Sequence, residues 1–282
     1  EKAKSLQIPI TKYKYIENGY INQSDIDTYK TPIVVKSINE SGGRNTSYYE
    51  DKTSLSTLLL KNQIIESYVN GTEYSVEMLV QNGKIIFSNI TMYNKKYTQN
   101  ILPATLPERI KKTILDYSTK IVDGFGIKNS LCHAEFYVHG DAITFGEIAI
   151  RPPGGYIMNL LEMTYKSNFW KLFIEIQTMQ AITPPISKNP TYSAVWIIHP
   201  GQGRVNKIEG WESIQSTKGY AGGRLKIHPG DICKMRLGSG QDYGYIFFTD
   251  KCPESLIKRI ETAEELLKVD IDNDPNSLHL NK

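Results

Sequence analysis

The stretch "GEIAIRPPGG" (residues 146–155) places Glu147 in an apolar run and Arg151 just beyond it, then interrupts the run with two prolines and two glycines. It completes the longer segment "SLCHAEFYVHGDAITFGEIAIR" (residues 130–151), in which β-forming residues flank the turn residues "HGDA". This pattern predicts a β-hairpin. One acid, Glu135, lies in its first strand, and the other, Glu147, lies in its second.

The register of this hairpin decides what the two acids can do. A three-residue loop, or one bulge, brings Glu135 and Glu147 onto the same face of the sheet, whereas a plain two-residue loop separates them. Opposed carboxylates repel each other unless a cation lies between them, and Mg²⁺ commonly takes one or two carboxylates together with nucleotide phosphates. The segment therefore predicts a metal site, with the Arg151 guanidinium placed to hold a phosphoryl oxygen. The alternative is a pair of exposed acids on a half-buried hairpin.

Composition excludes several other classes of protein. The chain has 282 residues, 40% of them hydrophobic, which suffices for two domains or one large one. No apolar run reaches the ~18 residues of a membrane helix, and the start lacks the apolar region of a signal peptide. The charge of +3 is balanced, without a Lys/Arg stripe for nucleic acid. Because Cys132, Cys233 and Cys252 lie far apart without CxxC spacing, we expect neither disulfides nor a zinc site, and a cytoplasmic protein.

Hydrophobic periodicity predicts an α+β chain with antiparallel sheets. Helices are expected at residues 51–62, 106–126, 156–165, 169–180 and 252–269. Strands are expected at residues 31–37, 63–71, 72–83 and 84–93, the last three joined by Asn-Gly turns. The stretch "TPPISKNP" (residues 183–190) is the best candidate for an internal boundary.

Three upstream segments carry groups that suit a nucleotide. Lys36 ends the apolar strand "PIVVK", where its ammonium can meet phosphate oxygens. The loop "NESGGRNTS" (residues 39–47) can turn backbone N–H groups toward an anion. In "ESYVNGTE" (residues 66–73) an extended linker suits the edge of adenine, and Glu73 suits the ribose hydroxyls. Taken singly, each has an ordinary alternative: an exposed edge lysine, a surface loop, and a hairpin with solvated acids.

Taken in order, these four elements resemble the ATP-grasp superfamily over roughly residues 6–155, with a weaker similarity to residue 269. The resemblance implies an α+β fold in which two subdomains clasp ATP between antiparallel sheets, followed by a small C-terminal β subdomain. The boundaries it implies are a small (lid) subdomain at 1–67, a large subdomain with the metal site at 68–183, a β-rich part completing the large lobe at 184–269, and a disordered tail at 270–282.

The resemblance also implies residue roles and cofactors. ATP and Mg²⁺, with Mn²⁺ as an alternative ion, are the expected cofactors, and Glu135 and Glu147 are the metal ligands. Lys36 would bind the α/β phosphates, Arg151 would steady the transferring phosphoryl group, and His133 is a candidate catalytic base whose alternative is a satisfied core histidine. The remaining nucleotide contacts implied are Ser41, Gly42 and Gly43 on the β/γ phosphates, Glu66, Ser67, Tyr68 and Val69 at adenine, and Glu73 at the ribose.

One difference from most ATP-grasp proteins points to a particular subgroup of the family. Most relatives have Asn two places after the second acid, where this chain has Ala149. A small residue there, together with His133 and "RPPGG", is similar to carboxylate–amine ligases of the L-amino-acid (dipeptide) ligase type. Such ligases imply two substrates, a small-molecule carboxylate such as an amino acid and an amine. They also imply two steps, in which an acyl phosphate forms with release of ADP and the amine then displaces phosphate.

The sequence leaves the domain content and the exact reaction open. The family normally carries a Rossmann-like domain before this point, so we expect a longer protein or a partner chain to supply it. The alternatives in function are another ATP-grasp ligase, of the carboxylase or purine-pathway type, and a non-catalytic ATP-binding module. Arg151 argues against the last, because binding alone does not need it.

Overall fold

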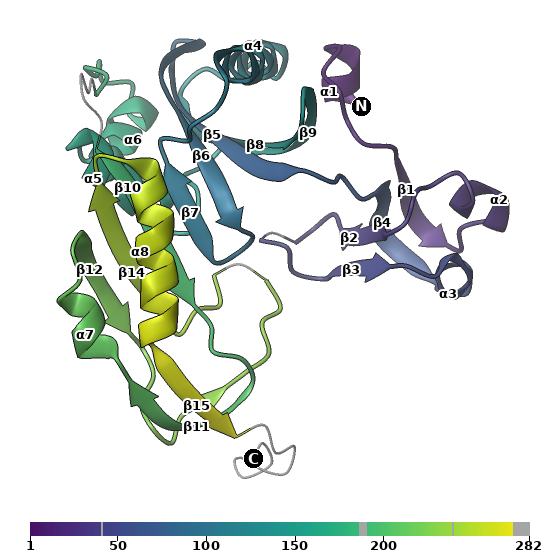
Figure 1. Ribbon diagram of the computed structural model, residues 1–282. Helices are drawn as coiled ribbons and strands as arrows, with labels where there is room; N and C mark the ends of the chain where they lie inside the picture. The colour runs from purple at the N-terminus through teal and green to yellow at the C-terminus, as the bar shows by residue number, and fades with distance from the viewer. Residues whose placement is uncertain (41, 186–190, 239, 273–282) are drawn as a thin grey trace.

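The computed structural model describes residues 1–40, 42–185, 191–238 and 240–272. Within them the chain forms a small N-terminal sheet at one side and a larger, helix-covered sheet at the other (Figure 1). All strand pairs within the sheets are antiparallel, and the predicted α+β class is confirmed.

The N-terminal sheet has the order β1-β4-β2-β3. Its elements are α1 (Lys2–Ser5), β1 (Tyr13–Gly19), α2 (Gln23–Ile26), β2 (Ile33–Ser37), β3 (Thr46–Tyr49), α3 (Lys52–Ser56) and β4 (Leu60–Ser67). Buried Ile26, Ile33, Leu55 and Ile65 form its core. The helix predicted at 51–62 is wrong beyond residue 56, because Leu60 begins β4, which pairs with both β1 and β2. Pairing on both edges outweighs the local helical pattern.

The larger sheet has eight strands in the order β12-β14-β10-β7-β6-β5-β8-β9. They are β5 (Thr72–Gln81), β6 (Lys84–Lys95), β7 (Gln99–Leu102), β8 (Ser130–His139), β9 (Ala142–Ala149), β10 (Tyr192–Ile198), β12 (Tyr220–Leu225) and β14 (Gly244–Asp250). Strands β10, β12 and β14 come from the part of the chain predicted to complete the large lobe. Most of the predicted boundary at 183–190 lies outside the described residues.

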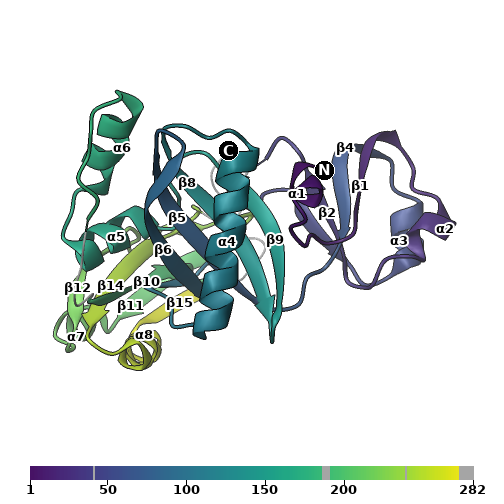
Figure 2. The same ribbon diagram turned by 90° about the horizontal axis from the view of Figure 1, so that it is seen from above.

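Helices cover both faces of this sheet (Figures 1 and 2). The helices are α4 (Glu108–Gly124), α5 (Ile157–Tyr165), α6 (Phe169–Gln177), α7 (Trp211–Gln215) and α8 (Pro253–Leu266). Because side chains alternate along a strand, Met78 of β5 packs with the α4 cluster while its neighbour Leu79 packs with α5 and α6. On β10, Ala194 packs with the α8 cluster and Val195 with α5. Among the described residues, no helix is long and apolar enough to cross a membrane.

A third sheet, β13-β11-β15, lies at the C-terminal end. It comprises β11 (Gly203–Glu209), β13 (Ile232–Cys233) and β15 (Lys268–Asp272). The disordered tail predicted from residue 270 is wrong for residues 270–272, because Ile271 pairs with Val205 and packs in the small core around it. The rest of that prediction, residues 273–282, lies outside the described residues.

The two Asn-Gly dipeptides expected to join strands behave differently. Asn82 and Gly83 have φ of 52° and 77° and close the β5–β6 hairpin as predicted, since the favoured two-residue turn needs positive φ at both positions. Asn70-Gly71 closes no hairpin, because β4 and β5 belong to different sheets. This dipeptide instead lies in the linker between the two sheets.

The β8–β9 hairpin has the register on which the predicted site depends. His139 pairs with Ala142 across a two-residue turn, but the pairing shifts by one residue between Ala134 and Phe136. This bulge puts Gly146 and Glu147 together opposite Glu135. A Cβ on Gly146 would lie 3.0 Å from the Tyr137 ring, so glycine suits the crowded extra position. The expectation that one bulge places the two acids on one face is confirmed.

Candidate active site

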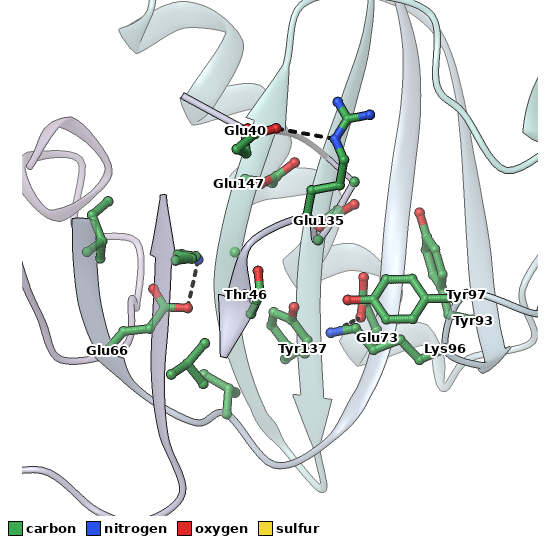
Figure 3. Close-up of a pocket in the computed structure, with 18 of the residues that line it drawn as sticks. Glu40, Thr46, Glu66, Glu73, Tyr93, Lys96, Tyr97, Glu135, Tyr137 and Glu147 are labelled. Carbon is green, nitrogen blue, oxygen red and sulfur yellow. Dashed lines mark hydrogen bonds and ion pairs between the residues drawn. The ribbon is translucent and has the colours of Figure 1, made fainter. Parts of the chain in front are cut away.

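A cavity of about 500 Å³ lies between the N-terminal sheet and the eight-stranded sheet. Figure 3 shows Glu66 on the N-terminal side and Glu73, Glu135 and Glu147 on the other. A single cleft therefore collects acidic side chains from segments far apart in the sequence. The cations Lys36, Lys96, Arg44 and Arg151 also line it.

Lys36 enters the cavity from β2. Its Nζ lies 2.7 Å from a carboxylate oxygen of Glu66 on the adjacent strand β4. Lys36 is paired in register with Ile64, and Glu66 with Val34, so the two side chains are diagonal neighbours on one face. Glu66, expected at adenine, is thus the partner of the expected phosphate-binding lysine.

The linker after β4 is only partly available to a ligand. Of the described residues, those lining the cavity include Tyr68 and Val69 but not Ser67. The Ser67 N–H donates to the Lys12 carbonyl at 3.0 Å, and its carbonyl accepts from the Thr11 hydroxyl at 2.8 Å. The backbone of Ser67 is therefore engaged within the protein, and the adenine contact expected for it stays a prediction.

The glycine turn at residues 42–43 forms part of the cavity wall. Gly42 and Gly43 have φ of 67° and 73°, a conformation that other residues adopt at a cost. A Cβ on Gly43 would lie 2.4 Å from the Tyr97 hydroxyl, so any other residue at this position would have to displace the Tyr97 ring. Both glycines line the cavity, and their contact with phosphates stays a prediction. Ser41, predicted beside them, lies outside the described residues.

Glu73 lies at the start of β5, where its side chain is 11% exposed and faces Lys96 at 3.3 Å. Burial, followed by the charge of Glu135, raises the pKa of Glu73. Burial lowers the pKa of Lys96, but Tyr137 and Glu73 outweigh burial and raise it. Lys96 was not predicted, because nothing in the sequence distinguishes it from Lys95, which points away to Glu264 at 2.7 Å.

Glu135 and Glu147 form the acidic centre of the cavity. Burial, followed by the charge of Glu135, raises the pKa of Glu147, while Lys36, His133 and Arg151 oppose that rise. The repulsion between two neighbouring carboxylates is relieved when a cation lies between them. Arg151, just beyond β9, lines the same cavity and donates from Nη1 to the Pro152 carbonyl at 2.9 Å.

His133 lies beneath the acidic pair and is only 5% exposed. Its Nδ1 is 3.1 Å from Glu77 Oε1, and its Nε2 is 3.2 Å from Glu135 Oε1. Burial lowers the pKa of His133, but the hydrogen bonds to Glu135 and Glu77 outweigh it and raise the pKa to about 10. Both ring nitrogens are already engaged by carboxylates, so this geometry favours the core-histidine alternative over the general base.

Glu77 is the acid that sequence reasoning missed. It is 1% exposed in the apolar run "YSVEMLV", the same signal that identified Glu147. Burial raises its pKa, but the hydrogen bond and charge of His133 outweigh burial and lower it. Glu77 is therefore an ionised carboxylate held inside the sheet.

The donor set of the cavity fits a hard divalent cation. In the part of the chain that the structure describes, no group of three or more His, Cys, Asp or Glu side chains is arranged to hold a metal ion. Glu135 and Glu147 supply two carboxylates, and Ala149 adds none. Mg²⁺ is commonly bound by one or two carboxylates, with phosphates and waters completing its shell, so the pair suits an ion that arrives with a nucleotide.

Comparison with known sequences agrees with this geometry. Residues 30–159 match the ATP-grasp domain model, and residues 195–272 match L-amino acid ligase C-terminal domain 2. The chain is 25% identical over 238 residues to an L-arginine-specific L-amino acid ligase from Bacillus subtilis. The alignment covers 77% of this chain and 57% of that protein, so the chain spans little more than half of this relative. The resemblance to ATP-grasp proteins and to L-amino acid ligases is confirmed.

Solved structures show the same fold. An L-amino acid ligase from Bacillus licheniformis superposes with a TM-score of 0.76 at 16% identity, covering 96% of this chain and 70% of that one. N5-carboxyaminoimidazole ribonucleotide synthetase from Thermotoga maritima gives 0.71 at 18% identity, covering 96% and 71%. An ATP complex of carboxyaminoimidazole ribonucleotide synthase from Aspergillus clavatus gives 0.70 at 14% identity, covering 94% and 70%. The predicted ATP-grasp fold is confirmed.

Proposed function

We propose that this chain, which has the ATP-grasp fold and a C-terminal segment of the L-amino acid ligase type, binds ATP with Mg²⁺ and joins a carboxylate to an amine. The observation that carries the proposal is the pair Glu135 and Glu147, opposed across a bulge in one cavity with Lys36 and Arg151. A carboxylate pair flanked by cations suits a metal–triphosphate complex, whose charges it can balance.

The nucleotide would lie between the two sheets. Lys36 would leave Glu66 for a phosphate oxygen, and the backbone of Gly42 and Gly43 would cover the outer phosphates. Tyr68 and Val69 would hold adenine, and Glu73 would accept from the ribose hydroxyls. The burial of Glu73 supports its role, because Oε2 is buried and makes no hydrogen bond in the described structure beyond its ion pair with Lys96.

Glu135 and Glu147 would hold Mg²⁺, with Mn²⁺ as the alternative ion. When bound, the ion would neutralise phosphate charge and orient the γ-phosphate. Arg151 would bind a phosphoryl oxygen through its planar guanidinium as charge moves during transfer. The glycine turn at 42–43 would exclude water from the cavity, which protects a reactive acyl phosphate from hydrolysis.

The reaction would proceed in two displacements. A substrate carboxylate oxygen attacks the γ-phosphorus, the bond to the β,γ-bridging oxygen breaks, and ADP leaves with an acyl phosphate remaining. The amine nitrogen then attacks the acyl carbon, and phosphate leaves as the amide forms. The protein contributes mainly position and charge, since none of the residues placed here is a free general base.

The substrates proposed are amino acids or similar small molecules. The Bacillus subtilis relative is named as specific for L-arginine, which makes L-arginine the first compound to test. Because the chain spans 57% of that relative, we propose that a further domain, or a partner chain, completes the substrate site. The purine-pathway type of ligase shares the fold with a similar TM-score, but the match of residues 195–272 to an L-amino acid ligase domain favours amide formation between amino acids.

The test uses hydroxylamine as a general amine nucleophile that accepts the acyl group. Each L-amino acid is incubated with the protein, Mg-ATP and hydroxylamine, and ADP and hydroxamate are measured together. We expect ADP in step with hydroxamate for a subset of amino acids, with one ¹⁸O passing from labelled carboxylate into phosphate. ADP release with hydroxamate but without ¹⁸O transfer would contradict the acyl-phosphate route.

A further inference from the structure

A continuous chain of hydrogen bonds runs from the middle of the eight-stranded sheet to the acidic pair. Glu77 is at its inner end and accepts four hydrogen bonds. Its Oε1 accepts from Ser75 Oγ at 2.6 Å and from His133 Nδ1 at 3.1 Å. Its Oε2 accepts from Asn89 Nδ2 and Thr91 Oγ1, both at 2.7 Å. A carboxylate held at both oxygens by buried donors has a fixed orientation.

His133 links Glu77 to Glu135 through its two ring nitrogens. One ring nitrogen meets Glu77, and the other meets Glu135 Oε1 at 3.2 Å, with the Tyr93 hydroxyl at 3.3 Å. Both Glu77 and His133 are buried, whereas the Glu135 side chain reaches the cavity and is 21% exposed. The network therefore ends on one oxygen of a cavity carboxylate.

Glu135, where the network ends, needs a partner that fixes the orientation of its carboxylate. Glu135 lies at the bulge, where the β8–β9 pairing shifts register, and regular pairing is locally interrupted there. A glutamate side chain has several rotatable bonds, so a hydrogen bond to one oxygen restricts which oxygen faces the cavity. Partners behind a metal ligand fix its direction and tune its affinity for the ion.

We propose that Glu77 and His133 are positioning residues, which bind Glu135 Oε1 and so present Oε2 of Glu135 to the divalent ion of the nucleotide complex. This inference rests on the metal-dependent nucleotide binding proposed above. It explains why a fully buried acid occurs in β5 although it does not line the cavity. His133 acts through Glu135 and not as a ligand, since both of its ring nitrogens are already engaged.

The test measures Mn²⁺ binding in the presence of ADP by electron paramagnetic resonance, independently of turnover. In the variant Glu77→Gln an amide replaces the carboxylate at the same volume and cannot accept from all four donors. We expect the dissociation constant for Mn²⁺ to rise 10- to 100-fold, while ADP binding without metal changes less than about twofold.

The matched control is Thr164→Val, because Thr164 is buried and donates to Ser193 Oγ at 2.9 Å, away from this network. It should leave both dissociation constants unchanged. If Glu77→Gln does not fold, His133→Gln decides, since glutamine cannot bridge both carboxylates as the ring does, and its Mn²⁺ affinity should fall by a similar factor.

The outcomes separate the two proposals. A wild-type protein that binds ADP without any help from Mn²⁺ overturns the proposed metal site, and this inference with it. A wild-type protein that binds Mn²⁺ with ADP, with the network variant indistinguishable from Thr164→Val, overturns only the positioning role. A ¹⁴N coupling to bound Mn²⁺ that is lost in His133→Gln also overturns it, because it makes His133 a direct ligand.

Discussion

The charge of His133 makes stability depend on pH in a way that can be calculated. Its pKa is raised from the ordinary value of 6.5 to about 10. One pKa unit corresponds to about 1.4 kcal/mol, so the folded state favours the imidazolium by about 5 kcal/mol relative to the unfolded chain. The pKa is raised on folding, so this stabilisation is fully present below pH 6.5 and is lost as pH rises toward 10. In that window the folded protein binds one more proton than the unfolded chain, and the free energy of unfolding falls by about 1.4 kcal/mol per pH unit.

The assay is urea denaturation of metal-free protein at pH 7 and pH 9. Wild type should lose about 2–3 kcal/mol more than His133→Gln between these values, because the variant retains every other titrating group. The chain has five histidines, so the His133 ring resonance can also be assigned by its loss in the variant and followed directly by NMR. A resonance that titrates near pH 7, or equal pH dependence in the two proteins, would show that Glu77 and Glu135 do not hold the ring in its charged form.

Three other changes test neighbouring parts of the cavity. Gly43→Ala places a Cβ against the Tyr97 hydroxyl at positive φ, so we expect ATP affinity to fall at least tenfold and stability to fall by about 1 kcal/mol. The double variant with Tyr97→Ala should recover part of the ATP affinity, and no recovery would argue against this contact. Lys36→Met should weaken ATP binding at least tenfold by calorimetry. It should change the free energy of unfolding of the nucleotide-free protein by less than about 1 kcal/mol, because the pair with Glu66 is partly exposed. A loss of stability in the nucleotide-free protein as large as the loss of ATP-binding free energy would contradict a binding role. Glu147→Gln should raise the melting temperature of the metal-free protein, since burial and a neighbouring carboxylate raise the pKa of Glu147 and disfavour its charge; a lowered melting temperature would mean that no such repulsion exists.

Local signals predicted the fold where local chemistry decides it. The Asn82-Gly83 turn and the helix at 108–124 follow from backbone preference and from a 3.6-residue apolar period, and the structure has both. Asn70-Gly71 has the same chemistry, yet its flanking strands belong to different sheets. Which strand pairs with which depends on contacts distant in sequence, and a dipeptide does not carry that information.

The residues of the site also differ in whether the sequence alone could identify them. Acids in apolar runs identified Glu135 and Glu147, and the bulge needed to bring them together is present. Lys96 could not be distinguished from Lys95, because a bulge in the β6–β7 pairing between Tyr93 and Lys95 precedes them and only the fold shows which lysine enters the cavity. Glu77 could have been found, since a lone acid within "YSVEMLV" gives the same signal as Glu147.

Calorimetric titration of ATP into the wild type and Glu147→Ala, with and without Mg²⁺, tests most directly whether this cavity binds a metal–nucleotide complex. We expect ATP to bind the wild type more tightly when Mg²⁺ is present. In the variant we expect weak metal-independent binding to remain and the effect of Mg²⁺ to be lost. ATP binding by the wild type that Mg²⁺ does not change, or a variant that responds to Mg²⁺ as the wild type does, would contradict the assignment of this cavity as a metal–nucleotide site.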